Sequence, residues 1–245
     1  GLSMQPKESI NDFVIKFANV NGTGSASANG MFAKAIFRMG IPVSPRNIFP
    51  SNIQGLPTWY EVRVSQDGYL GRRGGIDMMI SVNPQSFAKD VSEVEPGGYM
   101  VYDTTKPLDL RHVRRDVNYL GIPLTEMCLR EYTDSRQRQL FKNVIYVGAL
   151  AALLNIDFAI LKDLVREQFK GKEKLITPNI HALEMGHQYA STHFTCPLGI
   201  HLKAGEQTPK HIEEFDQILM DGNTATALGA VYAGATVAAW YPITP

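Results

Sequence analysis

A glycine- and serine-rich turn, "GTGSAS" (Gly22–Ser27), is the first stretch whose residue types could do chemistry. Glycines let a backbone turn tightly and approach a ligand, and free N–H groups at the start of a following helix attract an anion. The stretch falls one glycine short of a dinucleotide fingerprint, and the next strand ends in "VSPRN" without the acidic residue that would hold ribose hydroxyls. Two interpretations stay open: an anion or phosphate site that includes Gly22, Gly24 and Ser25, or a glycine turn needed only for the chain crossover.

Two arginines between glycines form the second candidate, in "LGRRGG" before the apolar run Ile76–Val82. Guanidinium groups bind phosphate or carboxylate through paired donors, and flanking glycines leave backbone N–H groups free to join them. Taken alone, the stretch is typical of a solvated turn. Taken with the glycine-serine turn at an adjacent strand end, Arg72, Arg73 and Gly74 predict a cradle for a phosphorylated ligand, formed where the two loops converge.

The histidines raise the question of a metal site. His181, His187, His193 and His201 are widely spaced, no pair of them lies four residues apart, and Cys196 belongs to no CxxC motif. Scattered surface histidines explain this spacing better than zinc ligands do, so we predict no metal site on this chain. The sequence contains no Gly-x-Ser-x-Gly nucleophile elbow and no Walker phosphate loop.

Composition excludes several classes of function. Lysine plus arginine and aspartate plus glutamate both number 24, which leaves no basic excess for general binding of nucleic acid or an acidic membrane. The two cysteines, Cys128 and Cys196, make structural disulfides improbable and exclude an iron–sulfur or zinc quartet on this chain. The first residues do not form a basic region followed by an apolar run, so we predict no signal peptide and a cytoplasmic address.

The elements that must position these residues begin with a strand at Asp12–Val20. After the glycine-serine turn, apolar residues from Ala28 to Met39 recur at helical spacing, and Gly40 is placed to end the helix. "IPV" at 41–43 is the next strand candidate. This order of strand, turn, helix and strand predicts a parallel sheet with a right-handed crossover.

The middle of the chain predicts further strands, and the second half predicts helices. Ser44–Pro57 has three prolines and no period, which predicts a loop. "TWYEVRVS" alternates, which predicts a strand with one face in solvent. The full set of further predicted strands is Thr58–Ser65, Ile76–Val82, Tyr99–Asp103 and Gly121–Cys128, and the predicted helices are Asn143–Asn155, Asp157–Gly171 and one that opens with Thr177 as N-cap and Pro178. The sequence therefore predicts an α/β fold, a Rossmann-like and mostly parallel sheet with flanking helices.

The final 24 residues, from Gly222 to Pro245, carry no charge. Glycines, threonines and prolines interrupt the apolar pieces, which argues against a membrane span. The pattern predicts a helix over Asn223–Ala235 and a buried strand over Thr236–Pro242, as inside an α/β domain. We therefore expect this stretch to open a second domain.

Taken together, the turn, "RRGG", "PGGYMVYD", "NVIYVGALAALL" and "YPITP" resemble the 2-oxoacid:ferredoxin (acceptor) oxidoreductases. The resemblance is to an alpha subunit with a fused N-terminal gamma domain, as in the 2-oxoglutarate type. It implies a gamma domain associated with coenzyme A at residues 10–190, a linker at 191–218, and the incomplete start of a domain that binds the pyrimidine side of thiamine diphosphate at 219–245. The first turn departs from the Gly-x-Gly-Gly-Gln-Gly that is common in this family.

The resemblance also implies an activity and its parts. The family oxidatively decarboxylates a 2-oxoacid to an acyl-CoA and CO2, with thiamine diphosphate as electron sink and ferredoxin as acceptor. Thr244 would lie near the substrate carboxylate and Tyr241 beside the cofactor, whereas Gly22, Gly24, Ser25, Arg72, Arg73 and Gly74 would suit the phosphates of coenzyme A.

The resemblance further implies a hetero-oligomer that is inactive without its partner. A beta subunit would carry a 4Fe–4S cluster and share the thiamine diphosphate and its Mg²⁺. Two alternatives stay open: a stand-alone nucleotide-binding dehydrogenase, and a non-catalytic scaffold subunit.

Overall fold

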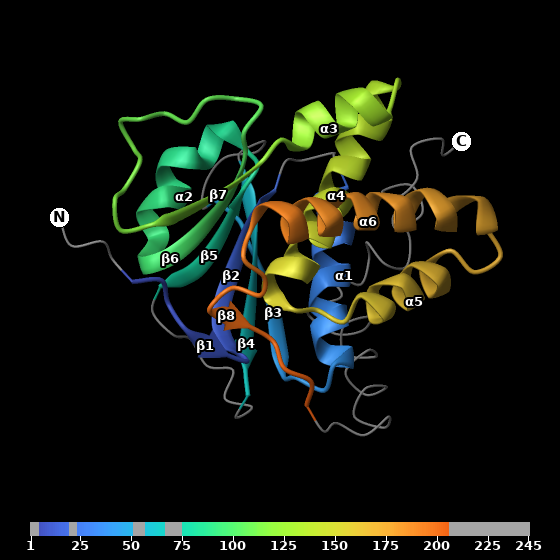
Figure 1. Ribbon diagram of the computed structural model, residues 1–245, viewed down its shortest axis with the longest axis horizontal. Coiled ribbons are helices and arrows are strands. Elements are labelled where there is room, and N and C mark those ends of the chain that lie inside the picture. The colour runs from blue at the N-terminus through green and yellow to red at the C-terminus, as the bar shows by residue number, and fades with distance from the viewer. Residues whose placement is uncertain (1–4, 20–23, 51–56, 67–74, 206–245) are drawn as a thin grey trace.

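A mixed sheet forms the centre of the computed structural model, which describes residues 5–19, 24–50, 57–66 and 75–205 (Figure 1). Its six strands lie in the order β3-β4-β2-β5-β6-β7. Strands β2, β5, β6 and β7 are parallel, whereas β4 is antiparallel to both of its neighbours. Their bounds are β2 Asp12–Asn19, β3 Val43–Ile48, β4 Thr58–Ser65, β5 Ile76–Ser81, β6 Val94–Asp103 and β7 Asn118–Ile122. The predicted α/β class with a mostly parallel sheet is confirmed.

Helices cover the sheet on both faces (Figure 1). The larger core packs the sheet against α1 and α4, with α5 and α6 farther out, and a smaller core packs it against α2. The helices and 3-10 turns are α1 Ser25–Arg38, η1 Pro84–Ser86, α2 Phe87–Glu93, α3 Leu124–Glu131, α4 Ser135–Leu154, α5 Phe158–Gln168, η2 Glu173–Leu175 and α6 Ile176–His193.

The local signals at the helix ends are confirmed in two places. Gly40 follows α1 with a φ of +81°, which a residue with a side chain rarely adopts, so glycine ends this helix as expected. The Asp157 carboxylate accepts a hydrogen bond from the Ala159 N–H at 3.0 Å and caps α5.

The β3–β4 hairpin corrects three predictions. Ser44–Ile48 was expected in a loop but lies in β3, where Pro45 is tolerated because β3 is an edge strand. β3 runs in the same direction as β2, yet β4 lies between them, so the predicted parallel pairing is wrong. β4 was expected to face solvent on one side, but six of its eight residues are buried, because helices cover both faces of the sheet.

Three element boundaries also differ from the predictions. The expected turn "EPGG" lies inside β6, which already begins at Val94 and pairs with β5 through a register shift. The predicted strand Gly121–Cys128 ends at Ile122, because Leu124 begins α3. Thr177 is not an N-cap, since η2 leads directly into α6 at Ile176.

Helices α4 and α6 touch along their backbones, and two glycines make this possible. A Cβ on Gly148 would overlap the carbonyl oxygen of Leu183, and one on Gly186 would overlap the carbonyl oxygen of Ile145. Every residue from Asn143 to Leu154 is buried, as the all-round apolar pattern predicts. The close approach therefore joins the innermost helix to the outer layer.

The residues that follow α6 contact the N-terminal segment and the end of α1. β1 (Ser9–Ile10) pairs in parallel with β8 (Ile200–His201), and the Gly205 N–H donates to the Met39 carbonyl at 2.8 Å. Residues 206–245 lie outside the described residues, so the predicted helix Asn223–Ala235, the strand Thr236–Pro242 and the domain boundaries stay predictions. Among the described residues, no helix is both long and apolar enough to cross a bilayer.

Candidate functional site

The four parallel strands all end at one edge of the sheet, which we call the carboxyl edge; the opposite side is the amino edge. The chain leaves β2 through α1 toward β3, at one end of the strand order. It leaves β5 through α2 toward β6, in the direction of the opposite end. The strand order therefore reverses between β2 and β5. Open α/β sheets bind ligands in the crevice at such a point, outside the carboxyl ends of the strands.

The start of α1 lies at this crevice. Gly24 is its N-cap, with φ 80° and ψ 10°, and glycine offers no side chain to cap the helix. Ser25 and Ser27 are 5% and 1% exposed, and the Ser27 hydroxyl has no hydrogen-bond partner among the described residues. The first turn of a helix leaves backbone N–H groups without intrahelical partners and carries partial positive charge. This uncapped start can hold an anion; Gly22 lies outside the described residues.

A network of buried amides lies beside the helix start. The Asn29 side chain donates to the Asn19 side chain at 2.7 Å, and the Tyr146 hydroxyl donates to Asn29. The Asn83 side chain, just after β5, donates to the Asn19 carbonyl at 3.1 Å. Burial raises the pKa of Tyr146, so its hydroxyl stays a donor. The network fixes the carboxyl ends of β2 and β5 relative to α1 and α4, and the sequence analysis missed it because asparagine carries no periodic signal.

A cavity of about 350 Å³ opens at the carboxyl ends of β5 and β6. Its lining is mostly apolar, with two lysines, two carboxylates and three amides. The lining residues are Ser81, Val82, Asn83, Pro84, Phe87, Tyr102, Asp103, Lys106, Pro107, Leu108, Asp109, Gln139, Lys142 and Asn143. The sequence analysis assigned none of these residues to a ligand site, although Tyr102, Asp103 and Asn143 belong to stretches on which the family resemblance rests.

Asp103, the last residue of β6, holds a lysine at the cavity. Its carboxylate accepts from the Thr125 N–H at 3.1 Å and from the Thr125 hydroxyl, and lies 3.2 Å from the Lys142 ammonium. Burial by itself raises the pKa of Asp103, but the Thr125 hydrogen bond and the Lys142 charge outweigh burial and hold the pKa below its usual range. The carboxylate therefore stays ionised and keeps Lys142 in place.

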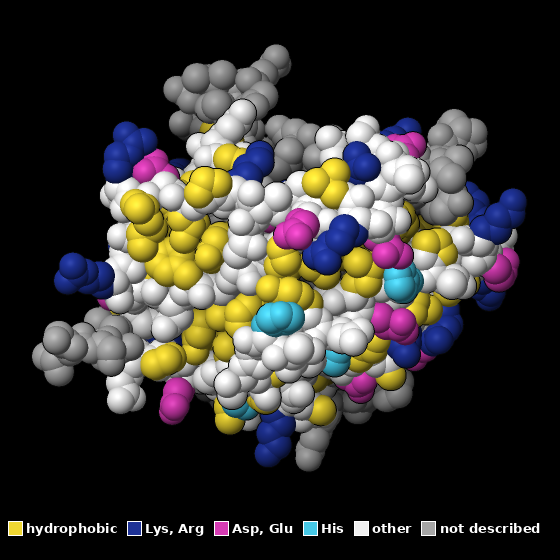
Figure 2. Space-filling model, turned by 45° about the horizontal axis from the view of Figure 1, so that its top comes forward, with side chains coloured by type: hydrophobic (Ala, Val, Ile, Leu, Met, Phe, Trp, Pro, Cys, Tyr) yellow, Lys and Arg dark blue, Asp and Glu magenta, His cyan; other side chains and the backbone are white. Residues whose placement is uncertain are grey.

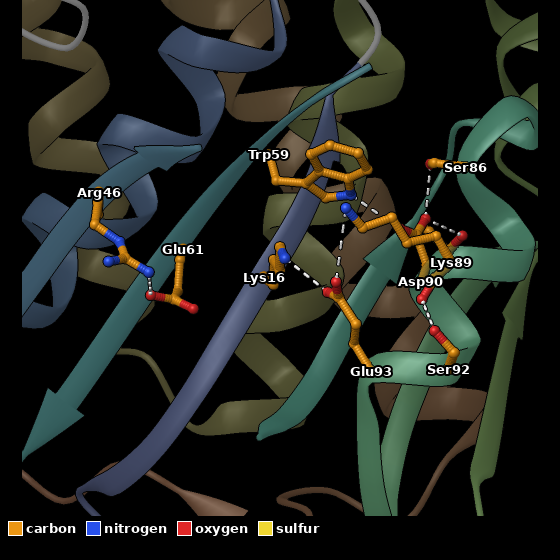
Figure 3. Close-up of polar contacts among 10 residues, drawn as sticks. Lys16, Arg46, Trp59, Glu61, Ser86, Lys89, Asp90, Ser92 and Glu93 are labelled. Carbon is orange, nitrogen blue, oxygen red and sulfur yellow. Dashed lines mark hydrogen bonds and ion pairs between the residues drawn. The ribbon is translucent and has the colours of Figure 1, made fainter. Parts of the chain in front are cut away.

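Figure 3 shows a second carboxyl group, Asp90 on α2, beside Trp59 and Ser86. It is fully buried and accepts from the Trp59 indole N–H at 2.8 Å, the Ser86 hydroxyl at 2.8 Å and the Ser81 hydroxyl at 3.0 Å. Burial outweighs these hydrogen bonds and raises the pKa of Asp90. Asp90 thus ties α2 and β4 to the carboxyl end of β5.

We expect Asp90→Asn to gain stability relative to the original chain as pH rises from about 4 to 7. The folded pKa of Asp90 is raised above 3.8, so its stabilising contribution is complete below that pH and is lost as pH rises through the folded pKa. Asparagine does not titrate and keeps an acceptor for Trp59. Urea unfolding of both proteins across this pH range measures the difference, and a difference that does not change with pH would contradict the raised pKa. Asp90→Ala, which leaves buried donors unpaired, should cost about 3 kcal/mol at pH 4 and less as pH rises, because the original chain itself loses stability there.

The two predicted ligand loops are not anchored at the same edge. Arg72, Arg73 and Gly74 lie outside the described residues, but their flanking residues Gln66 and Gly75 adjoin the end of β4 and the start of β5 at the amino edge. Gly24 follows β2 at the carboxyl edge, and the eight residues of β2 span roughly 26 Å. The described anchors of the two loops therefore lie at opposite edges, because a loop that precedes a parallel strand and a loop that follows one lie at opposite edges. The convergence of Arg72 and Arg73 with Gly24 on one ligand stays a prediction. Tyr241 and Thr244 also lie outside the described residues.

The histidines have separate surroundings. His181 lies 2.8 Å from Glu131, the ring of His193 stacks on Tyr189 at 3.9 Å, and His201 contacts the Leu198 carbonyl at 2.8 Å. Within the described ranges, no three His, Cys, Asp or Glu side chains form a group that could hold a metal ion.

Comparisons with known proteins agree with this arrangement. The family model described as pyruvate ferredoxin/flavodoxin oxidoreductase matches residues 14–189. The alpha subunit of 2-oxoacid:ferredoxin oxidoreductase 2 from Aeropyrum pernix is 25% identical over 271 residues, which cover 96% of this chain and 41% of that subunit. The chain thus spans about two fifths of this relative.

Two solved structures share the fold. One is the 2-oxoglutarate:ferredoxin oxidoreductase from Magnetococcus marinus with 2-oxoglutarate, coenzyme A and succinyl-CoA bound, at a TM-score of 0.67 and 24% identity over 80% of this chain and 34% of that one. The other is the gamma subunit of a keto/oxoacid ferredoxin oxidoreductase from Geobacter sulfurreducens, at a TM-score of 0.59 and 17% identity over 74% of this chain and 99% of that one.

Proposed function

Because the chain belongs to the pyruvate ferredoxin/flavodoxin oxidoreductase family, we propose that it is part of a 2-oxoacid:ferredoxin oxidoreductase. The proposed reaction is oxidative decarboxylation of a 2-oxoacid, with 2-oxoglutarate as the first choice, to an acyl-CoA and CO2 with reduction of ferredoxin. The alpha-subunit relative and the Magnetococcus marinus structure support this proposal. We assign the gamma-domain role to residues 10–190 and the start of the thiamine-binding domain to 219–245.

The role of the described residues in this proposal is to hold coenzyme A by a phosphate group. The observation that carries it is the uncapped start of α1, where Gly24 lets the backbone approach a ligand and the buried Ser27 hydroxyl has no partner among the described residues. Backbone N–H groups, a hydroxyl and a helix dipole together fit a phosphate. Arg72, Arg73 and Gly74 stay candidates for a second phosphate contact.

The remaining parts of the enzyme follow from the same proposal. Thiamine diphosphate with Mg²⁺ supplies the electron sink for decarboxylation when bound. Thr244 and Tyr241 are the candidates on this chain for contacts to the substrate carboxylate and to that cofactor. A beta subunit that carries a 4Fe–4S cluster would complete the site and pass electrons to ferredoxin.

Reconstitution tests the proposed reaction. A polypeptide that joins this chain to the remaining length of an alpha subunit of the family, combined with a cluster-bearing beta subunit, should reduce a viologen dye only when a 2-oxoacid and coenzyme A are both present. The chain alone should reduce none. A panel of 2-oxoglutarate, pyruvate and 2-oxoisovalerate then identifies the substrate. If dye reduction is as fast without coenzyme A, the role given to residues 10–190 is wrong.

We expect Arg72→Ala combined with Arg73→Ala to raise the KM for coenzyme A about tenfold in the reconstituted enzyme. A guanidinium–phosphate hydrogen bond contributes about 1.5–3 kcal/mol, and 1.4 kcal/mol is a factor of ten. Arg166→Ala is the matched control, because Arg166 is a half-exposed arginine that pairs with Asp163 at 3.0 Å on the same helix. Unchanged kinetics in the double variant would favour the scaffold alternative for this loop. Tight binding of NAD or NADP would favour a dehydrogenase.

A further inference from the structure

The cavity at the carboxyl ends of β5 and β6 has its own lining, which includes none of Gly24, Ser25 and Ser27. One lining residue, Asn83, donates to the Asn19 carbonyl at the carboxyl end of β2. Its volume of about 350 Å³ is within the range of sites for small molecules. In Figure 1, α3 follows the carboxyl end of β7 at the top of the molecule. Figure 2 shows the molecule with this top turned forward. Hydrophobic side chains form patches on this face, between isolated lysine and arginine side chains.

The two lysines of the cavity leave donors for an anion. Lys106 is exposed and has no ion-pair partner among the described residues. The Lys142 ammonium is 3.2 Å from the Asp103 carboxylate and 3.2 Å from the Thr125 hydroxyl. An ammonium group has three N–H donors, so these two contacts leave one for a ligand.

The carboxylates of the cavity are already neutralised. Asp103 pairs with Lys142, and Asp109 accepts from the Arg111 guanidinium at 3.0 and 2.9 Å. The Arg111 hydrogen bonds lower the pKa of Asp109 to about 2, so it stays ionised and paired. Lys106 therefore remains as the uncompensated charge of this group.

Apolar side chains line another part of the cavity, beside Ser81 and the amides of Asn83, Gln139 and Asn143. Val82 and Phe87 follow the end of β5, and Pro107 and Leu108 come from the segment after β6. A ligand held only by its charge would leave these side chains in water, whereas an apolar body would cover them.

We propose that this cavity binds a small organic anion, a carboxylate or a monophosphate with an apolar body, whose anionic group contacts Lys106 and Lys142. The apolar body packs against Phe87 and Leu108. This site goes beyond the proposed coenzyme A contact, because it needs neither Gly24 nor the partner subunit.

Calorimetric titration of the 245-residue chain tests the proposal with four probes. Phenyl phosphate and benzoate combine an anion with an apolar ring, benzyl alcohol lacks the anion, and inorganic phosphate lacks the ring. We expect the two aromatic anions to bind with Kd values on the order of 1 mM or below and the other two at least tenfold more weakly. Whichever of phenyl phosphate and benzoate has the lower Kd is the anion that the site prefers, and either result supports the site.

Two variants locate the binding. Lys106→Ala removes the unpaired cation, and Leu108→Asp adds a repelling charge at a partly exposed position. Each variant should therefore raise the Kd of the aromatic anions about tenfold or more. Lys170→Ala, an exposed lysine after α5, is the control and should change nothing. Circular dichroism melts show that the variants fold. The proposal is overturned if neither aromatic anion binds below 10 mM, roughly the weakest affinity of interest, if benzyl alcohol or phosphate binds equally well, or if binding persists in both variants.

Discussion

Gly186→Ala is expected to lower the free energy of unfolding by about 3 kcal/mol, although alanine is the better helix former. The added methyl group would overlap the Ile145 carbonyl oxygen and lie 2.8 Å from the Ala149 nitrogen, both in the backbone of α4. Backbone atoms of a buried helix cannot rotate away as a side chain can. α6 must therefore move away from α4, which opens the contact between the innermost helix and the outer layer.

Urea unfolding at constant pH measures this loss. Gln188→Ala, on the exposed side of the same helix, is the matched control and should change stability by less than about 0.5 kcal/mol. Gly148→Ala should lower the free energy of unfolding by a similar amount to Gly186→Ala, because its methyl group would overlap the Leu183 backbone in the same interface. The double variant should lose less than the sum of both single variants, since one separation of the helices relieves both overlaps. A loss at Gly186 no larger than at Gln188 would contradict the backbone contact.

Gly24→Val is expected to raise the KM for coenzyme A about 30-fold in the reconstituted enzyme. Gly24 has a φ of 80°, a left-handed conformation that a β-branched residue adopts only at a cost of about 2 kcal/mol. Valine would shift this backbone out of the left-handed region and move the first N–H groups of α1 away from the phosphate. About 2 kcal/mol of lost binding corresponds to a factor of about 30.

Gly171→Val separates backbone strain from loss of the ligand contact. Gly171 has a similar φ of +84°, and nothing lies within 4 Å of the position of an added Cβ. This control should lose stability to a similar extent while the KM for coenzyme A stays the same. If Gly24→Val also leaves the KM unchanged, the start of α1 does not hold the cofactor, although the family assignment would stand.

The positions of the described anchors of the two loops bear on how the chain is expected to use its surfaces. The carboxyl edge holds the start of α1, the amide network and the cavity, whereas Gly205, the last described residue, contacts Met39 at the opposite end of α1. Gln66 and Gly75, which flank the arginine stretch, belong to the amino edge with Gly205. Contacts proposed for Arg72 and Arg73 should therefore be sought on the amino edge.

The sequence by itself determined the features that depend on neighbours a few residues apart. Strand and helix periods predicted β2 and α1, and a continuous apolar run predicted β5. A terminal glycine predicted the end of α1, and Asp157 predicted the start of α5. The quoted motifs also identified the family that the comparison with residues 14–189 then showed. These signals are local, because the backbone conformation and the amphipathic period of an element depend on residues that are close together in the sequence.

The tertiary structure alone decided which elements are neighbours and at which edge each loop lies. The insertion of β4 between β3 and β2, the opposite edges of Gly24 and Gly75, and the cavity beside Asp103 all depend on contacts between residues far apart in the chain. A strand carries the same alternating pattern whichever way it runs and whichever strand it pairs with. Direction and order are chosen by the packing of the whole sheet, and they determine which polar side chains meet at the site.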